Sequence, residues 1–197
     1  MGLPADRLPD DAVVLKEWAV AIEALLEGRQ IMLLRKGGIV EETRDFQLIS
    51  PSFYLMPTYE HQRKELLKPQ YQAMLDQTLE GWSPQDTHVS IRAFGEVTET
   101  IEIVDQERLD RLRDLHIWTD AFAEERLKWK RTKPLHLLFI RVYRLSPPAR
   151  VPLLPAYTGC RSWVKLETGI DRGTLTPVLE EEEYFSEVEK IKRALER

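Results

Sequence analysis

Apolar residues recur at helical spacing in several segments of the chain. They predict helices over 58–68, 71–79 and 105–115, a fourth that starts at residue 119 or 120, and a last one over 176–197. Thr58 and Asp105 are placed to cap the first and third of these, and Gly81 to end the second. The buried stripe of the last helix is expected to be Phe185, Val188, Ile191 and Leu195.

Other segments alternate between apolar and polar positions, as strands do. Residues 88–104 alternate around Gly95, which predicts two strands joined by a tight turn or a bulge. Residues 135–145 ("LHLLFIRVYRL") are apolar on both faces up to Arg141, as in a strand in mid-sheet. Short strands are expected at 31–34 and in "RSWVKLE", and a proline-rich extended loop at 146–156.

The segment from Trp18 to Leu26 fits both periods. Its apolar residues match helical spacing when Leu15 and Leu25 are included, and they also alternate from Trp18 to Leu26. We favour the strand interpretation, in which "EGRQ" turns the chain into a second strand at "IMLLR". The alternative is a helix that Asp11 caps and that ends at Gly28.

Strands and helices therefore interleave along 197 residues, which indicates one mixed α/β domain with a central mixed sheet flanked by helices. We expect this domain to span 12–197 and the proline-containing residues 1–11 to form a flexible lead-in.

Composition points to a protein of the cytoplasm. One cysteine excludes an intrachain disulfide framework, and no stretch resembles a signal peptide or a span of about 20 apolar residues. We therefore expect no membrane partner and no cofactor. The sequence does not indicate an oligomeric state.

The charges are segregated along the chain. Residues 126–166 contain ten Lys or Arg and no acid, which leaves 18 of the 28 bases against all 33 acids elsewhere. If these Lys and Arg side chains share a face, they form an anion-binding surface. An aromatic side chain among them can then stack on nucleobases. The residues assigned to this surface are Lys128, Trp129, Lys130, Arg131, Lys133, Arg141 and Arg144.

The alternative is that these bases pair with the protein's own acids, such as the run Glu180 to Glu183. Surface pairs of that kind contribute about 0–1 kcal/mol each. The sequence alone leaves both interpretations open.

Catalytic and metal-binding motifs give little support to an enzyme. The four histidines lack metal-ligand spacing, and His136 in its apolar strand fits a core position. Cys160 follows a glycine and precedes Arg161, but a buried or inert thiol is the better interpretation. A second polar cluster is more suggestive: we consider Arg35, Glu41, Glu42 and His61 as a possible pocket.

The stretch "EALLEGRQIMLLRKGGIVEE" resembles the opening of a Nudix hydrolase, with a glycine-turned hairpin, a glycine pair and acids. Such enzymes need a helix of clustered glutamates that holds a divalent cation. The segment "HQRKELLK" lacks them, so the resemblance implies at most a Nudix-like scaffold.

The combination of "KEWAVAIEALLEGRQIMLLRKGGI", "PTYEHQ", "PLHLLFIRVYRL" and "GCRSWVKL" resembles a bacterial family of about this length, a domain of unknown function. The likeness spans roughly residues 13 to 195. Members are associated with restriction-endonuclease-type domains, so the resemblance implies a nucleic-acid or defence context. It carries no catalytic residues.

Three functions follow as hypotheses. The first is a module that binds nucleic acid or another anion through residues 126–166. The second is a degenerate or divergent Nudix-like enzyme that acts on a small phosphorylated molecule near Arg35, Glu41, Glu42 and His61. The third is a scaffold whose basic segment docks on an acidic protein.

Overall fold

The computed structural model describes residues 12–36, 48–128, 134–159, 161–171 and 173–196. The strands are β1 (Val13–Trp18), β2 (Met32–Arg35), β3 (Ser52–Thr58), β4 (His88–Ile103), β5 (Leu135–Pro152), β6 (Trp163–Lys165) and β7 (Thr174–Pro177). The α-helices are α1 (Ala19–Leu26), α2 (Gln72–Leu79), α3 (Gln106–Asp110), α4 (Asp120–Lys128) and α5 (Glu181–Glu196). Single 3₁₀ turns lie at Lys64–Leu66, Pro69–Tyr71, Arg113–Leu115 and Pro155–Tyr157.

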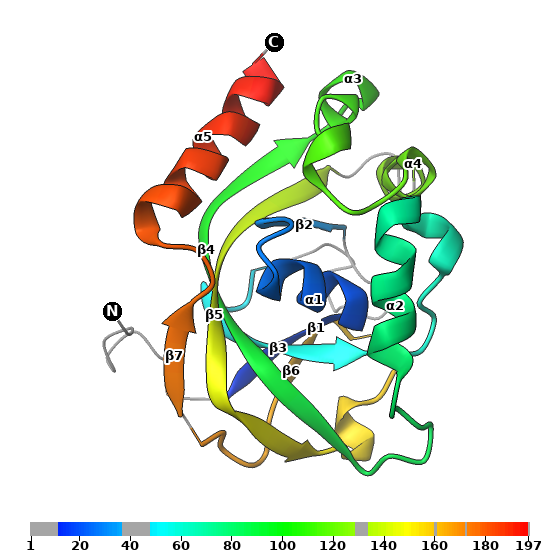
Figure 1. Ribbon diagram of the computed structural model, residues 1–197, viewed down its shortest axis with the longest axis vertical. Helices are drawn as coiled ribbons and strands as arrows, with labels where there is room; N and C mark the ends of the chain where they lie inside the picture. Colours follow the sequence, from blue (N-terminus) through cyan, green and yellow to red (C-terminus); the bar gives the residue numbers. More distant parts are fainter. Residues whose placement is uncertain (1–11, 37–47, 129–133, 160, 172, 197) are drawn as a thin grey trace.

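Within these residues the strands form one mixed, curled sheet. The order is β2-β5-β4-β3-β1-β6, and β7 pairs with β5. Only the β1–β3 pair is parallel; the other pairs are antiparallel. Helix α1 lies in the concave side of the curl, with α2 beside it (Figure 1). The single mixed α/β domain expected from the sequence is confirmed.

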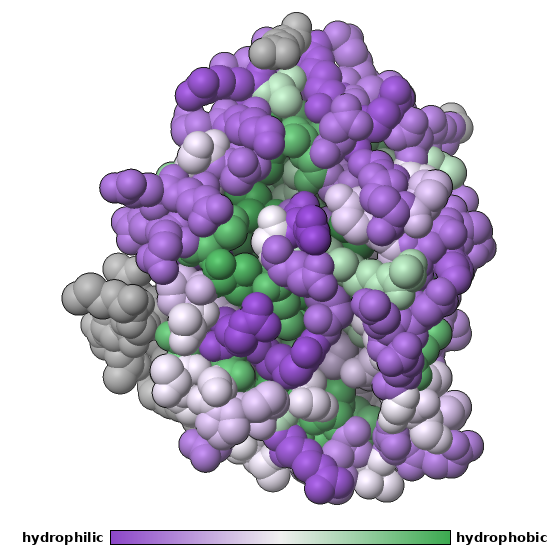
Figure 2. All heavy atoms as spheres, viewed as in Figure 1, coloured by the Kyte–Doolittle hydropathy of each residue, from purple (hydrophilic) through white to green (hydrophobic). Residues whose placement is uncertain are grey.

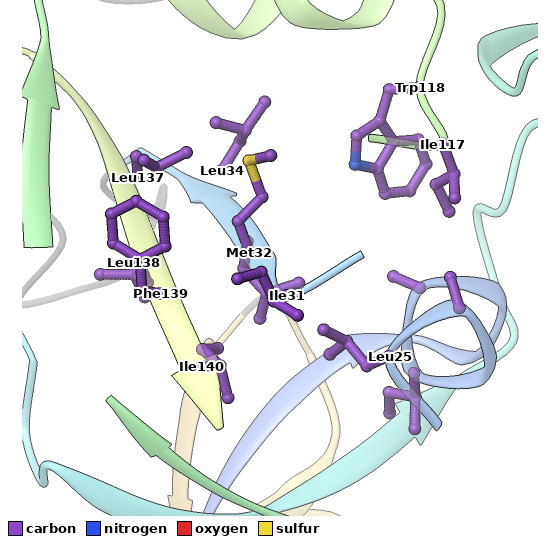
Figure 3. Packing of buried hydrophobic residues seen from close by; sticks show 14 of the residues in the cluster. Leu25, Ile31, Met32, Leu34, Ile117, Trp118, Leu137, Leu138, Phe139 and Ile140 are labelled. Carbon is purple, nitrogen blue, oxygen red and sulfur yellow. The ribbon is translucent and has the colours of Figure 1, made fainter. Parts of the chain in front are cut away.

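The interior of the curl holds the main core. Seven of the eight α1 residues are buried, since sheet surrounds the helix on several sides. Figure 3 shows Met32 and Leu34 of β2 beside Leu137 and Phe139 of β5, where the two strands pair. A second cluster, on the other side of the sheet, includes Tyr54, Phe94, Tyr143 and Val164. On the face seen in Figure 2, hydrophilic residues predominate and hydrophobic ones are visible mainly toward the middle.

The first hairpin prediction is wrong. Residues 13–18 are a strand, but residues 19–26 are helix α1, and β2 pairs with β5 rather than with β1. The glycine-turned hairpin of a Nudix opening is therefore not formed. The reason is burial. A helix that the sheet surrounds can be apolar on nearly all sides, so apolar residues at alternating positions no longer distinguish it from a strand.

Other predictions are corrected in detail. The expected helix over 58–68 is a turn followed by a 3₁₀ turn, because Thr58 ends β3 instead of capping a helix. Residues 88–103 form one continuous strand with two register shifts, and β5 continues through the proline-rich segment to Pro152. Helix α5 begins at Glu181, after strand β7, and buries Tyr184 where Phe185 was expected; Phe185 is exposed.

Several predictions are confirmed. Helix α2 and strands β2, β5 and β6 lie where the spacing indicates. The Asp105 carboxylate accepts a hydrogen bond from the Arg108 amide at 2.8 Å and caps α3. None of the helices in the described part of the chain combines the length and apolarity needed to cross a bilayer. Residues 1–11, the expected lead-in, lie outside the described residues.

Candidate functional site

A cavity of about 1180 Å³ lies beyond the carboxyl ends of β1 and β3. These two strands are parallel neighbours, so their last residues meet at one edge of the sheet, where ligand crevices commonly form. Other walls come from α4, from the loop at 80–86, from the start of β4 and from residues 157–159 and 161–162. Segments distant in sequence therefore converge on one hollow.

A buried ion pair forms part of the lining. Arg35 Nη1, at the end of β2, lies 2.9 Å from Glu17 Oε2, near the end of β1, and each side chain is 10% exposed. The other Glu17 oxygen accepts a hydrogen bond from the Trp18 amide at 2.8 Å. The pair joins two strands that do not pair directly with each other.

Two cations beside this pair have no carboxylate partner among the described residues. Arg126 of α4 lies over the Phe122 ring, 5.0 Å from its centroid. Burial, and then the neighbouring Arg35 charge, lower the pKa of Arg126. Lys36 donates from Nζ to the Leu127 carbonyl near the end of α4, and burial lowers its pKa. The charges of Glu17 and Glu125 act on the pKa of Arg126 in the opposite direction, but neither carboxylate forms an ion pair with it.

A third cation, Arg161, also lines the cavity. Lys16 Nζ donates to the carbonyls of Tyr157 and Gly159, at 2.8 Å each, and so anchors the loop that leads to Arg161. Arg161 is exposed, lines the cavity and forms no ion pair within the described ranges. Its guanidinium is available to an anion.

Aromatic rings supply the apolar part of the lining. Tyr59 and Trp82 stack with centroids 5.4 Å apart and an interplanar angle of 19°. Trp18 packs edge-on against Trp118, with centroids 5.3 Å apart. Burial, and then the charge of Asp86, raise the pKa of the Tyr59 phenol, so it stays protonated and can donate at neutral pH.

The "PTYEHQ" segment holds Tyr59 and His61 at the cavity. Gln62 Oε1 accepts a hydrogen bond from the Val20 amide at 3.0 Å, and Gln62 Nε2 donates to the Tyr59 carbonyl at 3.5 Å. His61 has φ 65°, a left-handed conformation that costs a non-glycine residue energy. The segment is therefore a tight turn anchored on the first turn of α1.

The structure brings part of each predicted site to this cavity. Arg35 and His61 of the polar cluster both line it, as does Lys128 of the basic segment. Lys128 Nζ also pairs with Glu124, at 2.8 Å, one turn earlier in α4. Glu41, Glu42, Trp129, Lys130, Arg131 and Lys133 lie outside the described residues.

Arg141 and Arg144, the two β5 residues assigned to the anion-binding surface, do not line the cavity. Arg141 pairs with Glu181 at 3.3 Å and lies over the Tyr143 ring, 5.5 Å from its centroid. Arg144 donates to the Leu26 carbonyl at 2.8 Å. For Arg141 the structure thus shows the pairing with the protein's own acids that the sequence left open. The role of Arg141 and Arg144 in anion binding stays a prediction.

Sequence reasoning missed Glu17 and Trp82 and did not single out Arg126. Only the fold brings Glu17 to Arg35 and Trp82 to Tyr59, so no local signal could have found them. No group of three or more His, Cys, Asp or Glu in the described residues could hold a metal ion. His136 is half-buried in β5, and Cys160 is outside the described residues.

Comparisons with known proteins give a family and a likeness of fold. The model of DUF1802, a domain of unknown function, matches residues 14–190. A search of curated proteins gave no match. A crystal structure of ASCH from Zymomonas mobilis is 11% identical, with a TM-score of 0.45, and the match covers 90% of this chain and 93% of that one.

A point mutant of the same ASCH protein gives similar values: 11% identity and a TM-score of 0.44, covering 82% of this chain and 92% of that one. These structures are ASCH proteins and not Nudix hydrolases. At such low identity the likeness concerns the course of the chain, and no function is inferred from it.

Proposed function

For this chain, which belongs to the DUF1802 family, a domain of unknown function, we propose that the cavity binds single-stranded nucleic acid. The observation that carries the proposal is the presence, in one cavity, of Arg126, which forms no ion pair with a described residue, and of the stacked Tyr59–Trp82 pair. Phosphates need cations, and unpaired bases need ring faces.

The electrostatics of the cavity support phosphate binding. Glu17 and Arg35 pair with each other, whereas Arg126, Lys36 and Arg161 form no ion pair with a described residue, although Glu60, Glu80, Asp86 and Glu125 also line the cavity. A guanidinium binds a phosphate through two parallel N–H donors, and it is less strongly hydrated than an ammonium group. Arg126 is therefore the main phosphate contact of this proposal.

The aromatic lining favours a single strand over a duplex. Bases inside a duplex stack on one another and offer no free faces, whereas unpaired bases stack on Tyr and Trp. The cavity is also larger than the roughly 300–1,000 Å³ of common small-molecule sites, so it has room for more than one nucleotide. Lys128 and the bases that follow it in sequence, Lys130, Arg131 and Lys133, extend the proposed contacts.

The test is fluorescence anisotropy with labelled single-stranded and double-stranded DNA and RNA at about 50 and 200 mM salt, a range over which phosphate contacts weaken strongly. The Arg126→Gln variant keeps most of the side-chain volume. We expect it to bind all single strands more weakly, with the salt slope reduced by about 0.7, the value for one phosphate contact on a single strand. Lys130→Ala combined with Arg131→Ala tests the following segment.

Arg193→Gln is the matched control, because Arg193 is exposed on α5, which does not line the cavity. It should leave both affinity and salt slope unchanged. Equal binding by the wild type, Arg126→Gln and Arg193→Gln would overturn the assignment of this cavity. No binding of any strand at low salt would overturn the proposed function altogether.

A further inference from the structure

We propose that one corner of the cavity binds a phosphomonoester, so that the site takes the phosphorylated end of a strand in preference to its interior. This basic corner consists of Arg35, Lys36 and Arg126 with the Glu17 carboxylate, and all four residues line the cavity. Such recognition rests on the proposed single-strand binding and adds to it the chemical class of the bound group.

Contacts between three elements hold the basic corner together. Arg35, the last residue of β2, lies 2.9 Å from Glu17 of β1. The next residue, Lys36, donates from Nζ to the Leu127 carbonyl in the last turn of α4. Arg126 precedes Leu127 in the same turn. The ends of β1 and β2 and the end of α4 therefore meet at one place in the cavity wall.

Packed aromatic rings hold the Arg126 guanidinium. It lies over the Phe122 ring, 5.0 Å from the centroid. Phe122 is stacked on Trp118, with centroids 4.1 Å apart and an interplanar angle of 19°, and the Trp18 centroid lies 6.0 Å away. A cation supported by rings that are themselves packed needs little rearrangement to meet an anion.

The basic corner forms an inner part of the cavity wall. Glu17, Arg35 and Lys36 are only 9%, 8% and 3% exposed, and yet they line the cavity. By contrast, Glu125 of α4 is exposed and lies 3.9 Å from Arg63, which is exposed as well. A strand can place its end in an inner corner, whereas an internal phosphate needs a path for the chain on both sides.

The charge of the basic corner fits a dianion better than a monoanion. Among the described residues, three cations and one carboxylate meet there, and neither Lys36 nor Arg126 forms an ion pair. A phosphomonoester carries a charge of about −1.5 to −2 at pH 7, whereas each phosphate inside a strand carries one negative charge.

Lys36 is the residue that most needs this second charge. Its ammonium group has three donors, of which the Leu127 carbonyl accepts one. A buried cation without a counter-ion is costly, and a bound dianion supplies the counter-ion. Arg126 then contacts the phosphate directly, and Lys36 provides the charge that favours a monoester over a diester.

The test is competition, followed by fluorescence anisotropy, against an internally labelled single strand. The competitors are oligouridylates of seven nucleotides with a 5′-phosphate or a 3′-phosphate, and an octamer with hydroxyls at both ends, which has equally many phosphates. We expect one phosphorylated end to bind about tenfold more tightly than the octamer, the lower end for a hydrogen bond to a charged group. Uridine 5′-monophosphate should compete much more weakly.

Lys36→Met removes the buried charge and keeps an unbranched side chain, so it should abolish the preference for the phosphorylated end. Arg126→Gln should abolish it too, in addition to the loss common to all strands, and it decides alone if Lys36→Met does not fold. Lys68→Met is the matched control, because Lys68 Nζ also donates to a backbone carbonyl, that of His116 at 2.6 Å, and Lys68 does not line the cavity. It should keep the preference.

Equal wild-type affinity for the phosphorylated heptamers and the octamer would overturn recognition of the end and leave single-strand binding standing. A preference that survives both Lys36→Met and Arg126→Gln, or one that Lys68→Met also abolishes, would overturn the role of the basic corner. Competition by uridine 5′-monophosphate as strong as that of the phosphorylated strand would contradict a strand-end site, since a mononucleotide would then suffice. If no strand binds, the proposed function fails first.

Discussion

Arg35 Nη1 lies 2.9 Å from Glu17 Oε2, and both side chains are nine-tenths buried. This contact joins the carboxyl ends of β1 and β2 at the cavity wall, beside Arg126. Taking two charges out of water is costly, so such a pair adds less stability than its short distance suggests. Removal of one partner is far more costly, because it leaves the other charge buried.

We therefore expect Glu17→Gln to lower the free energy of unfolding by about 3 kcal/mol, the lower end of the range for breaking a buried pair. The control is Glu27→Gln, because Glu27 pairs with Arg29 at 3.3 Å on the surface, with side chains 45% and 61% exposed. That variant should cost about 0–1 kcal/mol. Urea unfolding of both measures the difference, and equal losses would contradict a structural role for the pair.

The contribution of ring stacking to the affinity for single strands can be separated from the contribution of phosphate contacts. Trp82→Ala removes one ring of the stacked Tyr59–Trp82 pair and should weaken single-strand binding by about 1–3 kcal/mol, the usual value for one stacked base. The salt slope should stay the same, because no phosphate contact is lost. Trp82→Phe should retain much of the affinity. A reduced salt slope in Trp82→Ala would show that the ring acts by positioning cations.

Burial of His116 makes stability depend on pH. The residue is 3% exposed, and burial, followed by the nearby Lys68 charge, lowers its pKa from the ordinary 6.5 to about 4. Between these values the unfolded chain binds a proton that the folded chain does not. Stability is therefore complete above pH 6.5 and falls as the pH drops, by at most about 1.4 kcal/mol per pH unit.

Urea unfolding between pH 4 and 7 in His116→Gln checks this prediction. In this variant the free energy of unfolding should depend much less on pH between about 4 and 6.5 than in the wild type, whatever its stability at neutral pH. His88→Gln is the control, since His88 is exposed and should leave the slope unchanged. An unchanged slope in His116→Gln would assign the pH dependence to other groups.

The close contact of β4 and β5 at Gly95 explains why a glycine stands in mid-strand. A Cβ atom there would lie 2.9 Å from Ile140 Cγ2 and 3.5 Å from a ring carbon of Phe53. Gly95→Ala should therefore destabilise the protein by about 1–3 kcal/mol through overpacking. Gly169→Ala is the control, because nothing lies within 4 Å of its added atom. Thermal unfolding compares the two, and equal melting temperatures would mean that the strands yield easily.

Local patterns in the sequence determined much of the secondary structure and the fold class. Strand β5 was predictable because a run apolar on both faces fits mid-sheet, and the cap of α3 because Asp105 interacts only with nearby residues. The segregation of charge is likewise a property of the sequence. These features depend on neighbours within a few positions, which the sequence contains in full.

Only the tertiary structure decided the rest. Residues 19–26 suit a strand or a helix equally by pattern, and the curl of the sheet around them makes them α1. Tyr184 takes the buried position expected for Phe185, and its hydroxyl lies 2.7 Å from Thr98 Oγ1 of β4. The sequence predicts Arg35 and His61 as members of a polar cluster. The cavity that they line also contains Glu17, Trp82 and Arg126 from other segments. Long-range contacts are set by how elements pack, and no periodicity within the chain encodes them.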